Sequence, residues 1–289
     1  MTTGDPLDPL GFSVTGRRQR ANDLDGKTWT RYSLSIWSDI RKTREEIALG
    51  HPALFPQELV FRLLSIFLSG TGKTVLDPFA GSGSTVVAAA RSGHRGIGLE
   101  LSAEFVAMAK RRLSELYASV EPLLGEGEIW EADAHRLLEY VRPDSVDLVI
   151  TSPPYWDVLS QRRSADHKPI RDYPHPLPPA GDDRDLSQVK EYDQFLDKLQ
   201  TIFADVRTVL RPGAYCVVVV MDLRKGGRFY PFHSDLARHL QEAGLTFEDL
   251  VIWDRRQEYN RLRPLGYPSV FRVNKVHEYI LIFRRPLQP

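Results

Sequence analysis

The stretch from Thr74 to Thr85 constrains the fold of this chain more than any other. It begins with the apolar strand pattern of 73–76, turns between Asp77 and Gly83, and continues into an alanine-rich helical pattern. A strand, a glycine-containing turn and a helix form the first unit of a nucleotide-binding α/β sheet, because glycines let the backbone approach a ligand closely. The turn lacks the lysine of a phosphate-binding loop, and Asp77 would repel a triphosphate but can pair with a ligand's ammonium group. We therefore expect a nucleoside-type ligand other than a triphosphate.

Acidic residues end the next two predicted strands. Glu100 follows the strand pattern of 95–99, and in a doubly wound sheet an acid at this place reaches the ribose hydroxyls of a bound nucleoside. Asp133 follows the pattern of 127–132, where a carboxylate can accept a hydrogen bond from an adenine amine. Because the carboxyl ends of parallel strands meet at one edge of the sheet, these acids are expected to share one site.

A fourth strand pattern, 146–150, leads into the segment Thr151-Ser152-Pro153-Pro154-Tyr155-Trp156. Two adjacent prolines neither extend a helix nor donate to a sheet ladder, so they predict a stiff turn at the strand's carboxyl end. The Ser152 hydroxyl and the Pro153 carbonyl can accept the two protons of an exocyclic amine while Tyr155 stacks on the ring. The turn therefore suits a planar base that carries an amino group.

The tetrapeptide 152–155 resembles the (Asp/Asn/Ser)-Pro-Pro-(Tyr/Phe/Trp) signature of the amino-group DNA methyltransferases, which methylate cytosine N4 or adenine N6. The segment 77–85 resembles the cofactor loop of that family, and 51–59 resembles the segment that cups the methionine part of its cofactor. The resemblance implies S-adenosyl-L-methionine as the cofactor and Ser152, Pro153, Pro154 and Tyr155 as the catalytic residues. It implies these cofactor-binding residues: His51, Pro52, Phe55, Pro56, Asp77, Pro78, Phe79, Gly81, Gly83, Ser84, Thr85, Glu100, Leu101, Asp133 and Ala134.

The resemblance also implies the fold. We expect a Rossmann-like α/β domain of the class I methyltransferase type, with a seven-stranded, mostly parallel sheet, an antiparallel last strand near 276–283, and helices on both faces. Residues 51–289 would form this catalytic domain, and 1–50 an N-terminal extension or arm. Within the extension, 29–37 alternates enough to predict a strand or an ordered arm.

Composition limits how DNA can be held. The formal net charge is zero, so phosphate contacts must come from local basic clusters rather than from the whole surface. The loops 157–185 and 255–275 are the candidates for target recognition. The predicted DNA-contacting residues are Trp156, Arg162, Arg163, Arg224, Lys225, Arg228, Arg255 and Arg256.

Other classes are disfavoured by simple counts. The one cysteine, Cys216, lies in an apolar run and predicts a buried residue; it excludes a disulfide framework and a cysteine-rich zinc site. Proline stands where the cytosine-C5 methyltransferases carry their catalytic cysteine, which excludes that chemistry. No metal is expected. The sequence has neither a bilayer-spanning apolar stretch nor a signal-peptide layout, so a cytoplasmic protein is expected.

The target base and the partners stay open. Within the family, serine at the first motif position favours cytosine, so we prefer cytosine N4 over adenine N6. The base would be flipped from duplex DNA or taken from single-stranded DNA. A homodimer and a cognate restriction endonuclease are compatible partners. The alternatives are an RNA or protein-glutamine amino methyltransferase, a catalytically silent DNA-binding subunit of a methyltransferase, and a NAD-dependent oxidoreductase.

Overall fold

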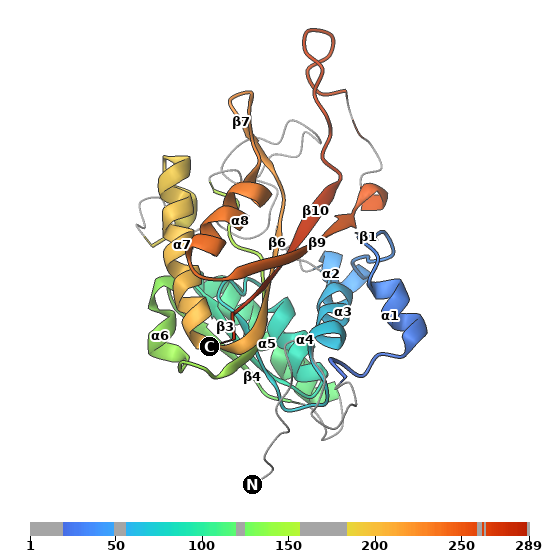
Figure 1. Ribbon diagram of the computed structural model, residues 1–289, viewed down its shortest axis with the longest axis vertical. Helices are drawn as coiled ribbons and strands as arrows, with labels where there is room; N and C mark the ends of the chain where they lie inside the picture. Colours follow the sequence, from blue (N-terminus) through green and yellow to red (C-terminus); the bar gives the residue numbers. More distant parts are fainter. Residues whose placement is uncertain are drawn as a thin grey trace.

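The computed structural model describes residues 20–48, 56–119, 125–156, 184–258, 262 and 264–287. An eight-stranded sheet with the order β1-β9-β10-β6-β5-β2-β3-β4 forms its centre (Figure 1). The strands are β1 (Ile36–Trp37), β2 (Thr74–Asp77), β3 (Arg95–Glu100), β4 (Gly127–Glu131), β5 (Val146–Thr151), β6 (Leu210–Val220), β9 (Thr246–Asp254) and β10 (His277–Arg284). Neighbouring strands are parallel except at β10, which runs antiparallel to β6 and to β9.

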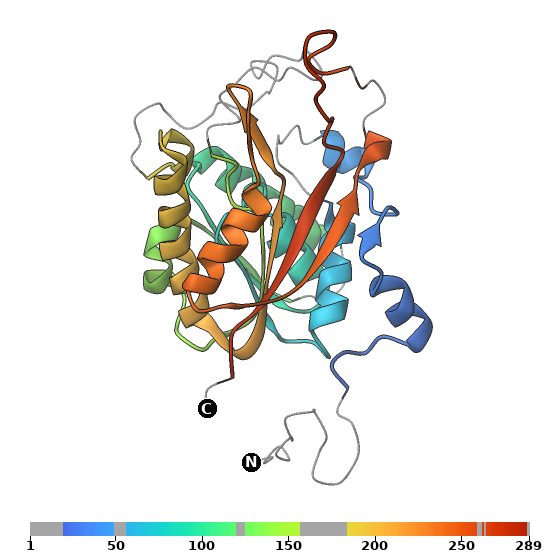
Figure 2. The same ribbon diagram turned by 45° about the horizontal axis from the view of Figure 1, so that its top comes forward.

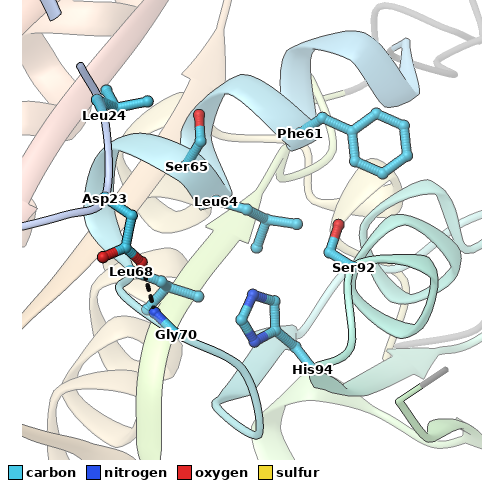
Figure 3. A pocket seen from close by; sticks show the side chains of 9 residues that line it. All are labelled: Asp23, Leu24, Phe61, Leu64, Ser65, Leu68, Gly70, Ser92 and His94. Carbon is cyan, nitrogen blue, oxygen red and sulfur yellow. Dashed lines mark hydrogen bonds between the residues drawn. The ribbon is translucent and has the colours of Figure 1, made fainter. Parts of the chain in front are cut away.

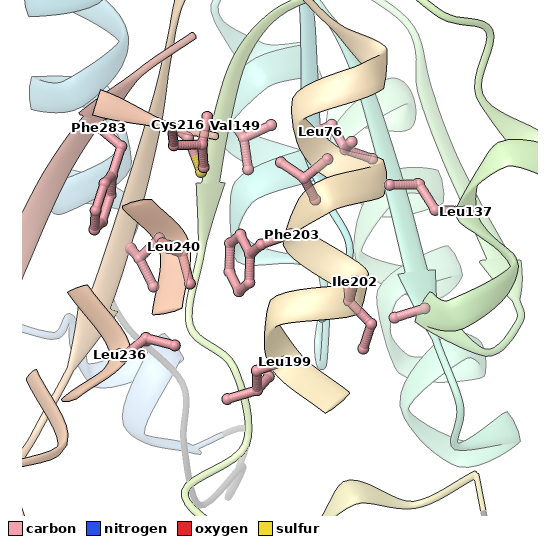
Figure 4. Close-up of a cluster of buried hydrophobic side chains, with 14 of the residues drawn as sticks. Leu76, Leu137, Val149, Leu199, Ile202, Phe203, Cys216, Leu236, Leu240 and Phe283 are labelled. Carbon is pink, nitrogen blue, oxygen red and sulfur yellow. The ribbon is translucent and has the colours of Figure 1, made fainter. Parts of the chain in front are cut away.

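Helices cover both faces of the sheet, because the central strands are apolar on both sides. In β6, Val217 and Val219 pack into the cluster under helix α3, whereas Cys216 and Val218 pack into the opposite cluster under α7 and α8 (Figure 4). The helices of the first face are α3 (Gln57–Phe67), α4 (Ser84–Arg91) and α5 (Ala103–Ser119). Those of the second face are α6 (Leu137–Tyr140), α7 (Tyr192–Val209) and α8 (Phe232–Glu242). Cys216 is buried, as its apolar surroundings in the sequence predict.

The expected α/β class, with a mostly parallel sheet and an antiparallel last strand, is confirmed. The strand number differs, because seven strands were expected and the main sheet has eight. The additional strand is β1, a two-residue edge strand that pairs in parallel with β9. A hairpin of β7 (Leu223–Lys225) and β8 (Arg228–Tyr230) follows β6 and forms a separate two-stranded sheet.

Of the two alternatives for 29–37, a strand or an ordered arm, the strand is found only in the last two residues. Helix α1 (Gly26–Tyr32) occupies the first half, because the Asp25 carboxylate accepts hydrogen bonds from the backbone N–H groups of Lys27 and Thr28 and caps the helix. Only β1 is a strand. Farther along, Trp37 and Ile40 are buried in the cluster under α3, so this part of the extension belongs to the core of the molecule. Helix α2 (Arg44–Ala48) follows.

The sheet positions a site at its carboxyl edge. From β2 the chain continues to β3 on one side, while β5 lies on the other side of β2, so the strand order reverses between β2 and β5. Open α/β sheets bind ligands at this kind of switch point. Close packing at this edge favours glycine at position 83. Its φ is +79°, and a Cβ atom added there would lie only 2.7 Å from the Cβ of Ala109. Among the helices that the structure describes, none has the length and apolar character required to cross a bilayer.

Candidate active site at the carboxyl edge of the sheet

The carboxylate of Asp77, at the end of β2, joins three elements. Its Oδ1 accepts hydrogen bonds from the Thr151 hydroxyl at 2.6 Å and from the backbone N–H of Phe79 at 3.1 Å. Its Oδ2 accepts from the Thr85 hydroxyl on α4 at 2.8 Å. Thr151 is the last residue of β5, so Asp77 fixes the start of the Ser152–Tyr155 turn against the glycine turn. Asp77 is only 1% exposed, and its hydrogen bonds here are to groups of the protein; its pairing with a cofactor ammonium stays a prediction.

Glu100 has a geometry suited to a ribose. One carboxylate oxygen accepts from the backbone N–H of Gly81 and the other from that of Ser102, each at 2.8 Å. Burial raises the pKa of the Glu100 carboxyl, and these two hydrogen bonds oppose the rise. A carboxylate oxygen can accept more than one hydrogen bond, so both oxygens keep the capacity to receive a vicinal diol. The side chain is only partly buried, as this role requires.

The remaining predicted cofactor residues divide by exposure. Those with partly exposed side chains at this edge are Phe79, Gly81, Leu101 and Asp133. Those that are buried and build the turn or the adjoining helix starts are Pro56, Pro78, Gly83, Ser84, Thr85 and Ala134. Asp133 accepts from the backbone N–H of His135 at 2.9 Å and so caps the short 3-10 helix Ala134–Arg136. His51, Pro52 and Phe55 lie outside the described residues.

The turn is supported from below by Arg112 of α5, which the sequence did not single out. Its guanidinium donates to the backbone carbonyl of Ser82 at 2.5 Å and lies 3.4 Å from the Ser84 hydroxyl. The turn is thus rigid, and its partly exposed rim offers Glu100, Asp133 and the Phe79 ring. Carboxylates for hydroxyls and an amine, with an aromatic side chain beside them, fit the nucleoside part of S-adenosylmethionine.

The Ser152–Tyr155 turn presents two hydroxyls side by side. The Ser152 Oγ lies 3.3 Å from the Tyr155 Oη, and the Tyr155 hydroxyl donates to Glu278 Oε2 at 3.4 Å. The Tyr155 ring also packs edge-on against Phe232, with ring centroids 6.3 Å apart. Burial, and then the negative charge of Glu278, raise the pKa of Tyr155 well above its usual value. Pro153 is buried and holds the turn against the sheet.

Glu278 is a site residue that the sequence analysis missed. It lies on β10, is 7% exposed, and also pairs with Arg255, which in turn pairs with Glu258 at 2.5 Å. Lys42 lies in the same electrostatic environment: burial and the Arg255 charge lower the pKa of its ammonium group. The signal was available in the sequence, because an acid interrupts the apolar strand pattern of 276–283.

The predicted DNA contacts of Trp156 and Arg255 do not fit their surroundings. Trp156 is 3% exposed and its indole N–H donates to the Val189 carbonyl at 2.7 Å. The Lys225 ammonium lies 3.6 Å from its ring centroid, so Trp156 anchors the β7–β8 hairpin rather than reaching a ligand. Arg255 is occupied by the two glutamates that flank it.

The other predicted basic residues are more accessible. Arg224 and Arg228 are exposed on the β7–β8 hairpin, and Arg256 is exposed beside Asp254, with which it forms an ion pair at 2.7 Å. Arg162 and Arg163 lie outside the part of the chain that the structure describes. Within that part, no cluster of three or more histidine, cysteine or acidic side chains is arranged to hold a metal ion.

A separate pocket lies at the opposite edge of the sheet. It has a volume of about 260 Å³ and is lined by residues of the N-terminal segment, α3 and the turns that precede β2 and β3 (Figure 3). Asp23 closes one side by accepting a hydrogen bond from the Gly70 N–H at 2.7 Å. Because it opens at the amino ends of the strands, this pocket is not part of the candidate active site.

A family model for DNA methylases of the N6/N4 type matches residues 14–111 and 146–289. The chain belongs to this amino-group DNA methyltransferase family, and the family expected from the motifs is confirmed. M.BamHII of Bacillus amyloliquefaciens, an orphan methyltransferase, is 38% identical over 88 residues, which are 30% of this chain and 32% of the relative. The DNA adenine methyltransferase YhdJ of Escherichia coli K12 is 43% identical over 64 residues, 22% of this chain and 21% of YhdJ.

Among solved structures, TTHA0409 of Thermus thermophilus is similar to this chain. It is described as a putative DNA modification methylase complexed with S-adenosyl-L-methionine. The identity is 27%, the TM-score is 0.36, and the match covers 54% of this chain and 51% of that chain. The chain therefore spans about a third or less of M.BamHII and YhdJ, and about half of TTHA0409.

The Asp77 node predicts a specific pH dependence of stability. Burial raises the pKa of Asp77 from 3.8 to about 6, so the folded state binds one more proton than the unfolded chain between these values. The resulting contribution to the free energy of unfolding is fully present below about pH 4 and is lost as pH rises through about 6. The loss amounts to about 3 kcal/mol. Asp77→Asn removes this titration. Urea unfolding between pH 4 and 7.5 should therefore show wild-type stability falling relative to the variant.

Asp249→Asn provides the matched control, because Asp249 is an exposed aspartate on β9. Its stability should follow the wild-type pH profile. If the stabilities of Asp77→Asn and the wild type changed in parallel with pH, the assigned burial of the ionisable Asp77 carboxyl would be contradicted.

Proposed function

We propose that this chain transfers a methyl group from S-adenosyl-L-methionine to the exocyclic amine of a base in DNA, with cytosine N4 preferred to adenine N6. The observation that carries the proposal is the Asp77–Thr151 hydrogen bond of 2.6 Å, which holds the amine-accepting turn beside the nucleoside-binding turn. Family membership supports the same assignment. S-adenosylmethionine supplies an electrophilic methyl group when bound; the protein's task is to position and orient the acceptor.

The hydrogen bonds between the hydroxyls of the site allow only one order of donors and acceptors. An ionised Glu278 can only accept, so Tyr155 donates its single proton to Glu278. Ser152 must then donate its proton to the Tyr155 oxygen, 3.3 Å away. The lone pairs of the Ser152 Oγ are left to accept a hydrogen bond from the amine of the base. The Pro153 carbonyl would accept the second amine proton, and both oxygens stabilise positive charge that develops on the nitrogen.

The same chain of hydroxyls gives the departing proton a route. After methyl transfer, the proton lost by the amine passes to the Ser152 Oγ, the Ser152 proton moves to the Tyr155 oxygen, and the Tyr155 proton moves to the Glu278 carboxylate. Neither the amine nor either hydroxyl has to be deprotonated beforehand. Glu278 therefore acts as the final acceptor of a short relay and orients the acceptor atom of Ser152.

The choice of base rests on Ser152 and has one competitor. A neutral serine at the first motif position favours cytosine, whereas YhdJ, 43% identical over 64 residues, is a DNA adenine methyltransferase. Unmodified DNA should be incubated with the purified protein and cofactor, digested to nucleosides and analysed by mass spectrometry. N4-methylcytosine is expected. Detection of N6-methyladenine instead would show that adenine is the target. If parallel assays showed transfer to RNA or protein but none to DNA, DNA would be excluded as the acceptor.

Ser152→Ala removes the acceptor of the amine hydrogen bond. We expect kcat to fall by about 10²-fold, in the range observed when one transition-state hydrogen bond is deleted. The affinity for S-adenosylhomocysteine, measured by calorimetry, should stay unchanged, because Ser152 does not contribute to the nucleoside-binding turn. Undiminished methylation would favour the catalytically silent alternative, in which transfer depends on another subunit.

Glu278→Gln tests the relay. Glutamine keeps the shape of the side chain but loses the charge that orients the hydroxyls and accepts the proton, so kcat should fall by about tenfold or more. Glu258→Gln is the matched control, because Glu258 also pairs with Arg255 but no hydrogen bond joins it to Tyr155 in the described contacts. Equal losses in the two variants would assign the effect to Arg255 instead.

The proposed DNA surface includes the β7–β8 hairpin, which has three basic and no acidic residues between 223 and 230. Arg228 is exposed there, with its guanidinium 4.9 Å from the Tyr230 ring centroid. Arg228→Gln should weaken DNA binding without regard to sequence and reduce the slope of log K against log salt concentration by about one. Fluorescence anisotropy across a salt series measures both. Arg238→Gln, an exposed arginine on α8, should leave the slope unchanged.

A further inference from the structure

The segment 264–276, here called the finger, carries aromatic side chains into solvent. It connects β9 to β10 and projects from the same end of the molecule as the β7–β8 hairpin (Figures 1 and 2). Tyr267 is 79% and Phe271 is 94% exposed. The tip is nevertheless a closed turn, because the Val270 N–H donates to the Gly266 carbonyl at 2.8 Å. A folded turn that holds two large rings in water is a surface shaped for a partner.

The base of the finger adjoins the candidate active site. The Arg255 N–H donates to the Val276 carbonyl at 2.8 Å and closes the base. Two residues after Val276, Glu278 accepts the hydrogen bond of Tyr155. Phe271 lies only a few positions before Val276, and an extended chain of that length spans at most about 17 Å. The tip is therefore within reach of the interior of a duplex whose backbone lies across the site, since the major groove is only about 8.5 Å deep.

The charge around the finger matches DNA. Residues 264–276 contain Arg272 and Lys275 and no acid. The Lys275 ammonium lies 4.1 Å from the Phe229 ring centroid, and the Arg272 guanidinium lies beside Gly227, so the finger rests on the β7–β8 hairpin. The two segments together present five basic residues and no acidic ones beneath an apolar tip. A polyanion with a stack of apolar rings inside it is complementary to this arrangement.

We infer that Phe271 is a wedge that enters the base stack of duplex DNA and holds open the place of the base delivered to the Ser152–Tyr155 turn. Apolar side chains inserted between base steps unstack them, and removal of a base from the stack is required before its amine can be methylated. The wedge acts on the DNA and not on the methyl transfer itself. The inference rests on the proposed function, and the experiment below separates the two.

The test compares two duplexes that contain the methylation site mapped with the unaltered protein. In one the target base is paired normally, and in the other it faces a mismatch, which already weakens its stacking. Phe271→Ala should lower kcat/KM on the paired duplex by about tenfold or more and by no more than about twofold on the mismatched duplex. Phe271→Leu, which retains an apolar wedge, should recover most of the loss. Trp29→Ala, a variant of another exposed aromatic residue, on α1, should match the unaltered protein on both duplexes.

Other outcomes have distinct meanings. An unchanged rate for Phe271→Ala on the paired duplex, or an equal loss on both duplexes, overturns the wedge and leaves the proposed function standing. A shift of Phe271→Ala to a smaller particle in size-exclusion chromatography would assign the tip to an interface between copies and also overturn the wedge. Absence of transfer to any DNA by the unaltered protein overturns the proposed function and the wedge with it.

Discussion

The buried carboxylate of Asp77 is the interaction on which the rest of this site depends. Removing an ionisable group from water is costly unless hydrogen bonds satisfy it. Here Thr151, Thr85 and the Phe79 N–H supply them, and they come from the end of β5, from α4 and from the turn after β2. The cost of burial is thus offset by bonds that fix two turns relative to each other. Methyl transfer between two bound molecules requires this kind of fixed geometry.

The last strand, β10, adds a side chain to the site that is formed at the ends of β2 and β5. Because β10 runs antiparallel between β6 and β9, it carries Glu278 to the Tyr155 hydroxyl across 123 positions of sequence. The connection that enters β10 is also the one that forms the finger. The proposed DNA-contacting segment and the residue proposed to orient Ser152 therefore belong to one short stretch of chain.

Local sequence patterns predicted the parts of the site that depend on one strand and the turn after it. The turn 77–83, the acid Glu100 and the turn 152–155 each follow a recognisable apolar run, so their position at the carboxyl edge could be anticipated. Predictions that required knowing which way a side chain points were less successful. Trp156 was assigned to DNA, yet it is buried. Arg255 was assigned to DNA, yet it pairs with Glu278 and Glu258.

The sequence by itself determined the α/β class, which strand patterns carry the motifs, and the family of the chain. These follow from apolar periodicity and from short motifs, which are properties of neighbouring residues. Only the tertiary structure decided that Glu278 faces Tyr155, that Trp156 contacts the β7–β8 hairpin, and that the base of the finger adjoins the site. Each of these depends on contacts between residues far apart in the chain. Sequence spacing does not encode them, because they arise only when β10 takes its place between β6 and β9.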